Sequence, residues 1–198
     1  MITIKAPHEN ILHSTYHARI DAMPQDEVKY KLTWIASDKI LDKHSKIITT
    51  QASCWVFTQD KKVILVSKDK EKWTITAGHP ESTDSDFKQT AIREVYEESG
   101  LDISAFKDQI SMLGYYIVET LDKYTKKLIK KTIQIRFFIV INAHSFSLKL
   151  KPNERQDQTD KIKFVNAFTL SEAALKVKWL PTSKDFIKLK KILGLSID

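Results

Sequence analysis

Three glutamates near the middle of the chain have the residue type and spacing that a metal ion needs. Glu97 and Glu98 follow Glu94 by three and four residues. On a helix this spacing projects all three carboxylates from roughly one face, where like charges repel unless a cation neutralises them. Clustered oxygen ligands suit Mg²⁺ and Mn²⁺, which usually complete their shells with water and substrate phosphates. The cluster therefore predicts phosphate-ester or phosphoanhydride chemistry.

The element that must position these glutamates is a helix over residues 87–99. Asp84 or Ser85 is expected to cap it, and Gly100 is expected to end it. Its other face is apolar, with Phe87, Ala91, Ile92 and Val95. The simpler interpretation of three glutamates is a solvated acidic stripe. A packed apolar face argues against that interpretation, because it holds the carboxylates in fixed directions.

The segment from Gly78 to Leu101 resembles a Nudix box, G-x5-E-x7-R-E-U-x-E-E-x-G-U, in which U is aliphatic. Residues 93–101 match its second half at every fixed position. Gly78 and Asp84 match the first half, with Asp in place of Glu. Eight residues rather than seven separate Asp84 from Arg93, and Ala77 replaces the glycine that often precedes the box. The inserted residue falls where a loop meets the helix, where extra length is easily absorbed.

The resemblance implies an α+β fold, a Nudix-type α/β/α sandwich with a mixed β-sheet. It also implies metal-dependent hydrolysis of a nucleoside diphosphate linked to another moiety, with Mg²⁺ or Mn²⁺ as cofactor. Glu94, Glu97 and Glu98 would bind the metal, and Glu94 is the favoured general base. Gly78 would turn the loop and offer its carbonyl to the metal. Arg93 would orient the carboxylates through charge-assisted hydrogen bonds.

Other residues are weaker candidates, each with a structural alternative. His79 is expected to contact phosphate or metal, or to be an ordinary loop histidine. Tyr115 and Phe137 are candidates to stack on a substrate base, although aromatic residues in strands usually belong to the core. His13 and His17 are better explained as surface or structural residues, and Cys54 as a core thiol. Later acids that could join the site are Glu119, Glu154, Asp157 and Asp160.

The rest of the pattern describes a mixed domain rather than regular βαβ alternation. Strands are expected over 47–58, 63–66, 73–76, 113–119, 131–142 and 162–168, and helices over 171–175 and 184–193. A helix is also expected from Pro24 to about His44. The expected domains are therefore an N-terminal extension with a helix at 1–45 and a Nudix hydrolase domain at 46–198.

Composition sets the remaining limits. The 198 residues carry a net charge of +7 and a single cysteine, which excludes an intramolecular disulfide framework. No apolar run reaches the ~20 residues of a membrane span and no signal peptide is apparent, so a cytoplasmic protein is expected. Basic segments at 123–131 and 184–191 are interpreted as solubilising or as steering an anionic nucleotide. Nucleic-acid binding is less favoured, and a homodimer is left open by the resemblance.

The expected function is hydrolysis of a phosphoanhydride bond in a nucleotide sugar such as ADP-ribose or in a nucleoside triphosphate. One alternative is a dinucleoside polyphosphate or capped RNA as substrate. An alternative of another class is a non-catalytic nucleotide-sensing or protein-binding module on the same fold. Repulsion among the three glutamates argues against that module, because without metal it would only destabilise the helix.

Overall fold

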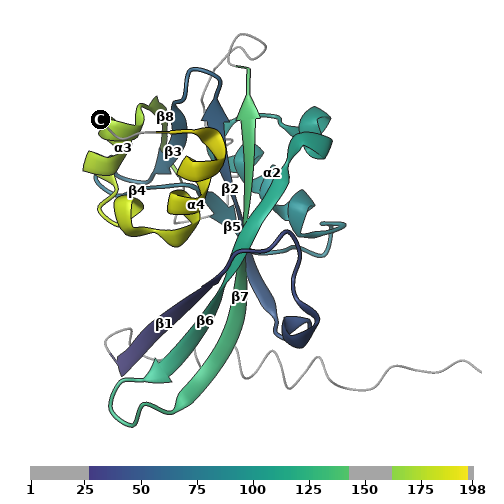
Figure 1. Cartoon of the computed structure of the whole chain (residues 1–198), viewed down its shortest axis with the longest axis vertical. Coiled ribbons are helices and arrows are strands. Elements are labelled where there is room, and N and C mark those ends of the chain that lie inside the picture. The colour runs from purple at the N-terminus through teal and green to yellow at the C-terminus, as the bar shows by residue number, and fades with distance from the viewer. Residues whose placement is uncertain (1–26, 143–161, 196–198) are drawn as a thin grey trace, which may run out of the picture. The chain divides into compact units, whose positions relative to one another are not determined.

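A mixed β-sheet organises the chain in the computed structural model, which describes residues 27–142 and 162–195. Strands follow the order β1-β6-β7-β2-β3-β4, with β5 paired to β2 and β8 paired to β3. Strand β2 runs parallel to β7 and antiparallel to β3 and β5. The strands, shown in Figure 1, are β1 (Val28–Ile35), β2 (Thr49–Thr58), β3 (Val63–Ser67), β4 (Trp73–Thr74), β5 (Thr76–Gly78), β6 (Ser111–Asp122), β7 (Leu128–Ile141) and β8 (Phe164–Phe168).

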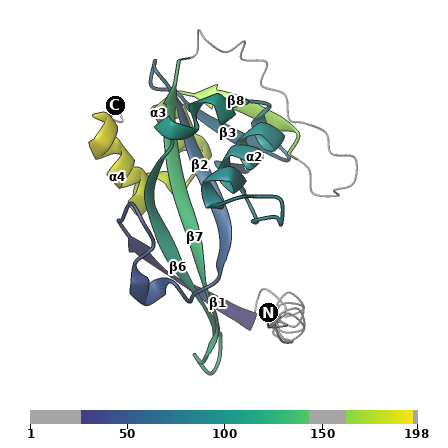
Figure 2. The same ribbon diagram turned by 90° about the vertical axis from the view of Figure 1, so that its right-hand side faces the viewer.

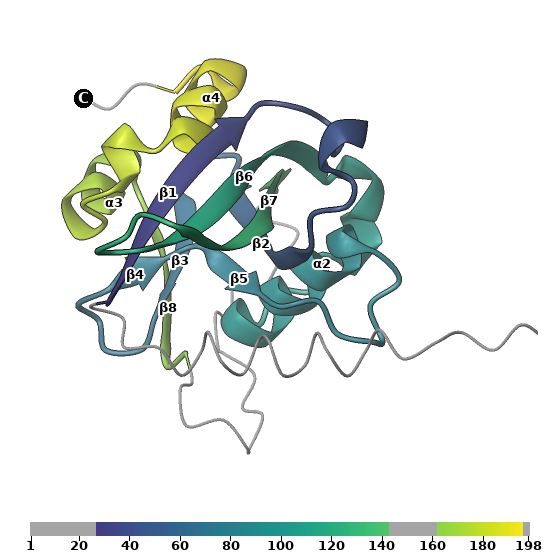
Figure 3. The same ribbon diagram turned by 90° about the horizontal axis from the view of Figure 1, so that it is seen from below.

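Helices cover both faces of this sheet (Figures 2 and 3). The longer ones are α2 (Phe87–Ser99), α3 (Leu170–Lys176) and α4 (Lys184–Leu193). Short 3₁₀ turns lie at Asp42–His44, Ser104–Gln109 and Leu180–Thr182. Helix α2 lies on one face, and α3 and α4 lie on the other.

Alternation along β2 explains why both faces need cover. Cys54 and Val56 belong to the core beneath α2, whereas Trp55 and Phe57 belong to the core beneath α3 and α4. Successive side chains of a strand point to opposite faces, so an apolar run must be covered twice. The α+β class with a mixed sheet and an α/β/α arrangement is therefore confirmed.

Contacts divide the described residues into two units. One contains residues 27–31 and 119–130, and the other contains 32–118, 131–142 and 162–195. In the first unit, Lys31 Nζ and Glu119 Oε2 form an ion pair of 3.0 Å. The turn between β6 and β7 is held by Asp122, whose carboxylate accepts the N–H groups of Tyr124 and Thr125. This turn joins two strands that are neighbours in the sheet.

The prediction of a helix from Pro24 to about His44 is wrong within the described residues. Residues 28–35 form strand β1, and only the short turn at 42–44 is helical. Apolar Val28, Tyr30, Leu32 and Trp34 alternate with polar residues, which is the period of a strand. Pro24, where the helix was expected to begin, lies outside the described residues. The domain boundary at residue 45 stays a prediction.

Most other elements agree with the pattern in the sequence. Helices α2 and α4 have the expected bounds, and the expected strands β2 and β3 pair antiparallel. The strand expected at 73–76 is instead two short strands, β4 paired to β3 and β5 paired to β2. Among the described residues, no helix is long and apolar enough to span a membrane.

Candidate functional site

Helix α2 presents the glutamates from a fixed position on the sheet. Ala91, Ile92 and Val95 are buried against the core. The cap is Asp86, whose side chain accepts the backbone N–H of Gln89. Neither Asp84 nor Ser85 caps the helix, because the helix begins at Phe87 and Asp86 is the residue immediately before it. Gly100 ends the helix in the left-handed region, at φ 77°, as expected.

Arg93 joins the carboxylates on the outer side of this helix. Its Nη1 donates to Glu94 at 2.7 Å and to Glu97 at 3.1 Å, and lies 3.4 Å from a carboxylate oxygen of Glu81. Its Nε and Nη2 donate to the two oxygens of Asp84 at 3.0 and 3.1 Å. One guanidinium therefore contacts four carboxylates and fixes their directions, which is the geometry an orienting role requires.

Asp84 is part of this cluster despite the inserted residue. Its side chain is 4% exposed, and it also accepts the backbone N–H of Glu81. Hydrogen bonding to Arg93 lowers the pKa of Asp84 to about 2. For Arg93, burial opposes the charge, but the bonds to Asp84 and the charges of Glu94 and Glu97 outweigh it and raise its pKa. Asp84, which stands where the Nudix box has glutamate, thus binds Arg93 through both of its carboxylate oxygens.

Glu98 and Glu94 lie against the end of β5. Glu98 Oε2 accepts the backbone N–H of Ala77 at 2.9 Å, and burial raises the pKa of Glu98 to about 8. Burial also raises the pKa of Glu94. A Cβ at Gly78 would collide with the Glu94 carboxylate. Gly78 has no left-handed φ, so the absence of a side chain, rather than a special turn, is what the site uses.

The chemistry of this cluster fits a hard divalent cation. In residues 27–142 and 162–195, no three His, Cys, Asp or Glu side chains already form a ready-made metal centre. Arg93 holds Glu94 and Glu97, while Glu98 turns toward Ala77. All the donors are carboxylate oxygens, and buried carboxylates are costly when ionised unless a cation compensates them. Enzymes of the family that this box resembles generally use divalent metals.

The weaker candidates lie in different places. The carbonyl of His79 accepts a hydrogen bond from Arg93 at 2.8 Å, and the His79 side chain is exposed. Tyr115 is fully buried, with its hydroxyl 2.7 Å from the ring of His44, and Phe137 is also buried. Both side chains fill the core beneath α2, and their assignment to substrate stays a prediction.

The later acids do not extend the cluster in the described residues. Glu119 pairs with Lys31, as noted above. Glu154, Asp157 and Asp160 lie outside the described residues, as do His13 and His17. Cys54 is a buried free thiol, and burial raises its pKa, as expected for a core cysteine.

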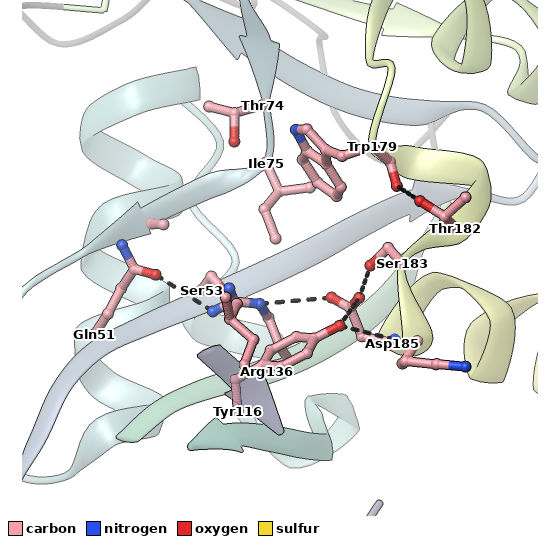
Figure 4. A pocket seen from close by; sticks show the side chains of 13 residues that line it. Gln51, Ser53, Thr74, Ile75, Tyr116, Arg136, Trp179, Thr182, Ser183 and Asp185 are labelled. Carbon is pink, nitrogen blue, oxygen red and sulfur yellow. Dashed lines mark hydrogen bonds and ion pairs between the residues drawn. The ribbon is translucent and has the colours of Figure 1, made fainter. Parts of the chain in front are cut away.

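A cavity of about 450 Å³ is drawn in Figure 4. Ala77, whose backbone N–H binds Glu98, is one of its lining residues. Strands β1, β2, β4, β6 and β7, the residues around the turn at Leu180–Thr182 and the start of α4 contribute the remaining walls. Tyr116, the neighbour of the buried Tyr115, and Trp179, 43% exposed, are the aromatic residues of the lining.

A buried polar network forms one side of this cavity. Arg136 Nε lies 3.5 Å from Asp185 Oδ2, and Arg136 Nη1 donates to Gln51 at 3.4 Å (Figure 4). Asp185 also accepts hydrogen bonds from Trp55 Nε1 and the Tyr116 hydroxyl, both at 3.0 Å, and from Ser183. The cavity therefore combines apolar walls with a few fixed polar groups, as small-molecule sites do.

The sequence pattern did not reveal this cavity. Arg136 lies in a long apolar strand, and Asp185 lies in the first turn of a helix otherwise rich in lysine. A charged residue inside an apolar strand is a signal that it has a buried partner. The partner is 49 positions away in the chain, and only the packing of α4 on the sheet brings the two together.

Comparisons with known proteins agree with this geometry. A family model described as NUDIX domain matches residues 48–189. A Bacillus subtilis pyrophosphohydrolase, BsRppH, has a similar structure, with TM-score 0.51, 18% identity, and 85% of this chain and 94% of that chain covered. An Ap4A hydrolase from C. elegans gives TM-score 0.46 and 16% identity over 74% of this chain and 98% of that one. No curated protein matched the chain. Because the family model covers well over half of the residues, the chain belongs to the Nudix family.

Proposed function

We propose that this protein hydrolyses a phosphoanhydride bond in a nucleoside diphosphate linked to another moiety, using Mg²⁺ or Mn²⁺. The observation that carries the proposal is the carboxylate cluster of α2, which is partly buried and lies beside a nucleotide-sized cavity. A buried cluster of this kind costs stability in the absence of a cation. The hydrolysis that a bound cation makes possible explains why the protein contains a carboxylate cluster that costs stability.

The proposed roles follow from the contacts of each residue. Glu94, Glu97 and Glu98 hold the cation, with the Gly78 carbonyl as a further oxygen ligand. When bound, the cation neutralises phosphate charge and lowers the pKa of coordinated water. Arg93 keeps Glu94 and Glu97 oriented, and Glu94 is the favoured base for the attacking water. Raising the pKa of Glu94 by burial makes it a better proton acceptor than an exposed glutamate.

The cavity beside Ala77 is the proposed site for the nucleoside. A substrate in this cavity would place its phosphates near Glu98, because Ala77 lines the cavity and its N–H also binds Glu98. Trp179 offers a partly exposed ring for stacking on a base. Arg136 and Gln51 offer polar groups for its edge. Nucleotide sugars such as ADP-ribose and nucleoside triphosphates both fit this description.

Two alternatives to this function can be distinguished from it by the substrate screen described below. A dinucleoside polyphosphate or a capped RNA would place the same phosphoanhydride at the cluster. A non-catalytic module would bind nucleotide without turnover. A cytoplasmic location, a role for His79 at the phosphates and a homodimer stay predictions.

The test is a screen of nucleotide substrates with Mg²⁺ and Mn²⁺, with products separated by chromatography. Glu97→Gln and Glu98→Gln are each expected to lower kcat by about 10²-fold or more, because each removes a charged ligand. Asp108→Asn, an exposed carboxylate outside the cluster, serves as the matched control. Full activity in both glutamate variants would contradict the metal-site assignment. Tight nucleotide binding with no turnover would favour the non-catalytic module.

A further inference from the structure

A second cavity, of about 880 Å³, lies next to the first. Its walls come from the end of β3 and the loop after it, from β4, from Ile162, and from the end of α3 with the residues that follow it, 176–179. Thr74 and Trp179 line both cavities. Figure 4 shows these two residues at one side of the first cavity. The two cavities therefore share part of their walls.

Positive charge predominates around the second cavity. Four lysines line it, against two acids, Asp69 and Glu71; the lysines are Lys68, Lys72, Lys176 and Lys178. The Asp69 carboxylate is turned into its own loop, where it accepts the N–H groups of Glu71 at 2.8 Å and Lys72 at 2.9 Å. These backbone bonds lower the pKa of Asp69. Asp69 therefore stays ionised, and the four lysines still outnumber the two acids of the lining.

The loop that carries two of these lysines is held in one shape. Ser67 Oγ accepts the N–H groups of Asp69 and Lys70, and the carbonyl of Lys70 accepts the indole N–H of Trp73 at 2.7 Å. Lys176 Nζ lies 5.2 Å from the centre of the Phe168 ring. An ammonium group held over an aromatic ring loses less freedom when it binds an anion than a lysine that is extended into water.

Trp179 connects this charge to the first cavity. It stands on the shared wall with 43% of its surface exposed, and its indole meets Trp55 edge-on at 6.1 Å. A ligand that extends from one cavity into the other would cover that ring.

We propose that the lysine-lined cavity is a second anion-binding subsite of the same active site, which takes a phosphate carried by the substrate beyond its nucleoside. The inference rests on the proposed function, because it assumes that the nucleoside occupies the first cavity. It narrows the substrate class to nucleotides that bear a further phosphate on the ribose, either as a free monoester or as the diester of an oligonucleotide. Simple nucleoside triphosphates and ADP-ribose would leave the subsite empty.

The test compares ligands that differ by one phosphate. Binding of AMP and of adenosine 3′,5′-bisphosphate is measured by calorimetry on the full chain without metal, so that no turnover is involved. The bisphosphate is expected to bind roughly fivefold to tenfold more tightly, and the advantage should shrink as salt rises. The dinucleotide pApA distinguishes a free monoester from the diester of an oligonucleotide. If pApA binds more tightly than AMP by the same factor as the bisphosphate, the subsite accepts an oligonucleotide diester. If pApA binds no more tightly than AMP, the subsite takes a free monoester.

Matched variants locate the effect. Lys72→Gln combined with Lys178→Gln is expected to remove most of the bisphosphate advantage and to leave AMP affinity unchanged. Lys46→Gln combined with Lys191→Gln removes the same charge from exposed positions outside both cavities and should keep the advantage. Equal binding of all three ligands, or an advantage that survives in the cavity variant, would overturn the subsite. A bisphosphate advantage without hydrolysis of any substrate would overturn the catalytic proposal alone.

Discussion

At the scale of single residues, burial favours the neutral form of Glu98, whereas binding a cation requires its ionised form. Glu98 is held by the N–H of Ala77 in surroundings that favour its neutral form. A carboxyl group whose pKa is raised on folding contributes stability below its unfolded pKa, near 4.5, and loses that contribution as pH rises through its folded pKa, about 8. The metal-free protein should therefore lose stability through Glu98 between about pH 4.5 and 8.

Glu98→Gln tests this conflict, because glutamine is neutral and can still accept the Ala77 N–H. In EDTA at pH 8 the variant is expected to be more stable than the wild type by roughly 1–3 kcal/mol, with a smaller difference at pH 5. Urea unfolding followed by circular dichroism at both values measures it. A variant that is less stable than the wild type at pH 8 would show that the Glu98 charge is already compensated without metal.

At the scale of elements, α2 is defined by its ends as much as by its apolar face. Asp86 caps it two residues after Asp84, which leaves Asp84 free of the capping role and available to Arg93. The inserted residue of the box lies in this short connection. It moves the cap without moving Arg93 relative to the glutamates, because those positions belong to the helix itself.

Asp86→Ala should weaken the helix without removing any group from the cluster. Loss of an N-cap costs about 1 kcal/mol, with a range of roughly 0.5–2 kcal/mol. The free energy of unfolding from urea titration measures the change, with Asp108→Asn as a control. If Asp84 took over the cap, stability would change little and the contacts of Arg93 would be disturbed instead, which a fall in activity would reveal.

At the scale of the whole molecule, the cavity depends on a charge pair that joins α4 to the sheet. Asp185 accepts hydrogen bonds from Trp55 and Tyr116 and faces Arg136. Asp185→Ala would leave the Arg136 charge buried without its acid, at a cost of about 3–5 kcal/mol. Thermal and urea unfolding measure the loss, and Asp185→Asn, which keeps an acceptor, should cost less. Equal, small losses in both variants would mean that the pair contributes little to holding α4.

The extent of prediction from sequence differs between these scales. The bounds of α2 and α4 follow from local periodicity and end signals, which act within a few residues. Strand β1 was mistaken for a helix because three of its apolar residues also fit a helical spacing, while its alternation is completed by pairing with β6. Tyr115 and Tyr116 are equivalent in the sequence, yet neighbouring residues of a strand face opposite sides. The first is buried beneath α2 and the second lines the cavity.

The sequence by itself determined the carboxylate cluster, because Arg93, Glu94, Glu97 and Glu98 lie within six consecutive residues of one helix, and helical geometry alone brings them together. Only the tertiary structure decided the contacts that make the cluster a site. Ala77 reaches Glu98, Asp84 reaches Arg93, and Arg136 meets Asp185 through packing between separate elements. Such contacts depend on how the sheet and its helices fit together, and no spacing along the chain encodes that fit.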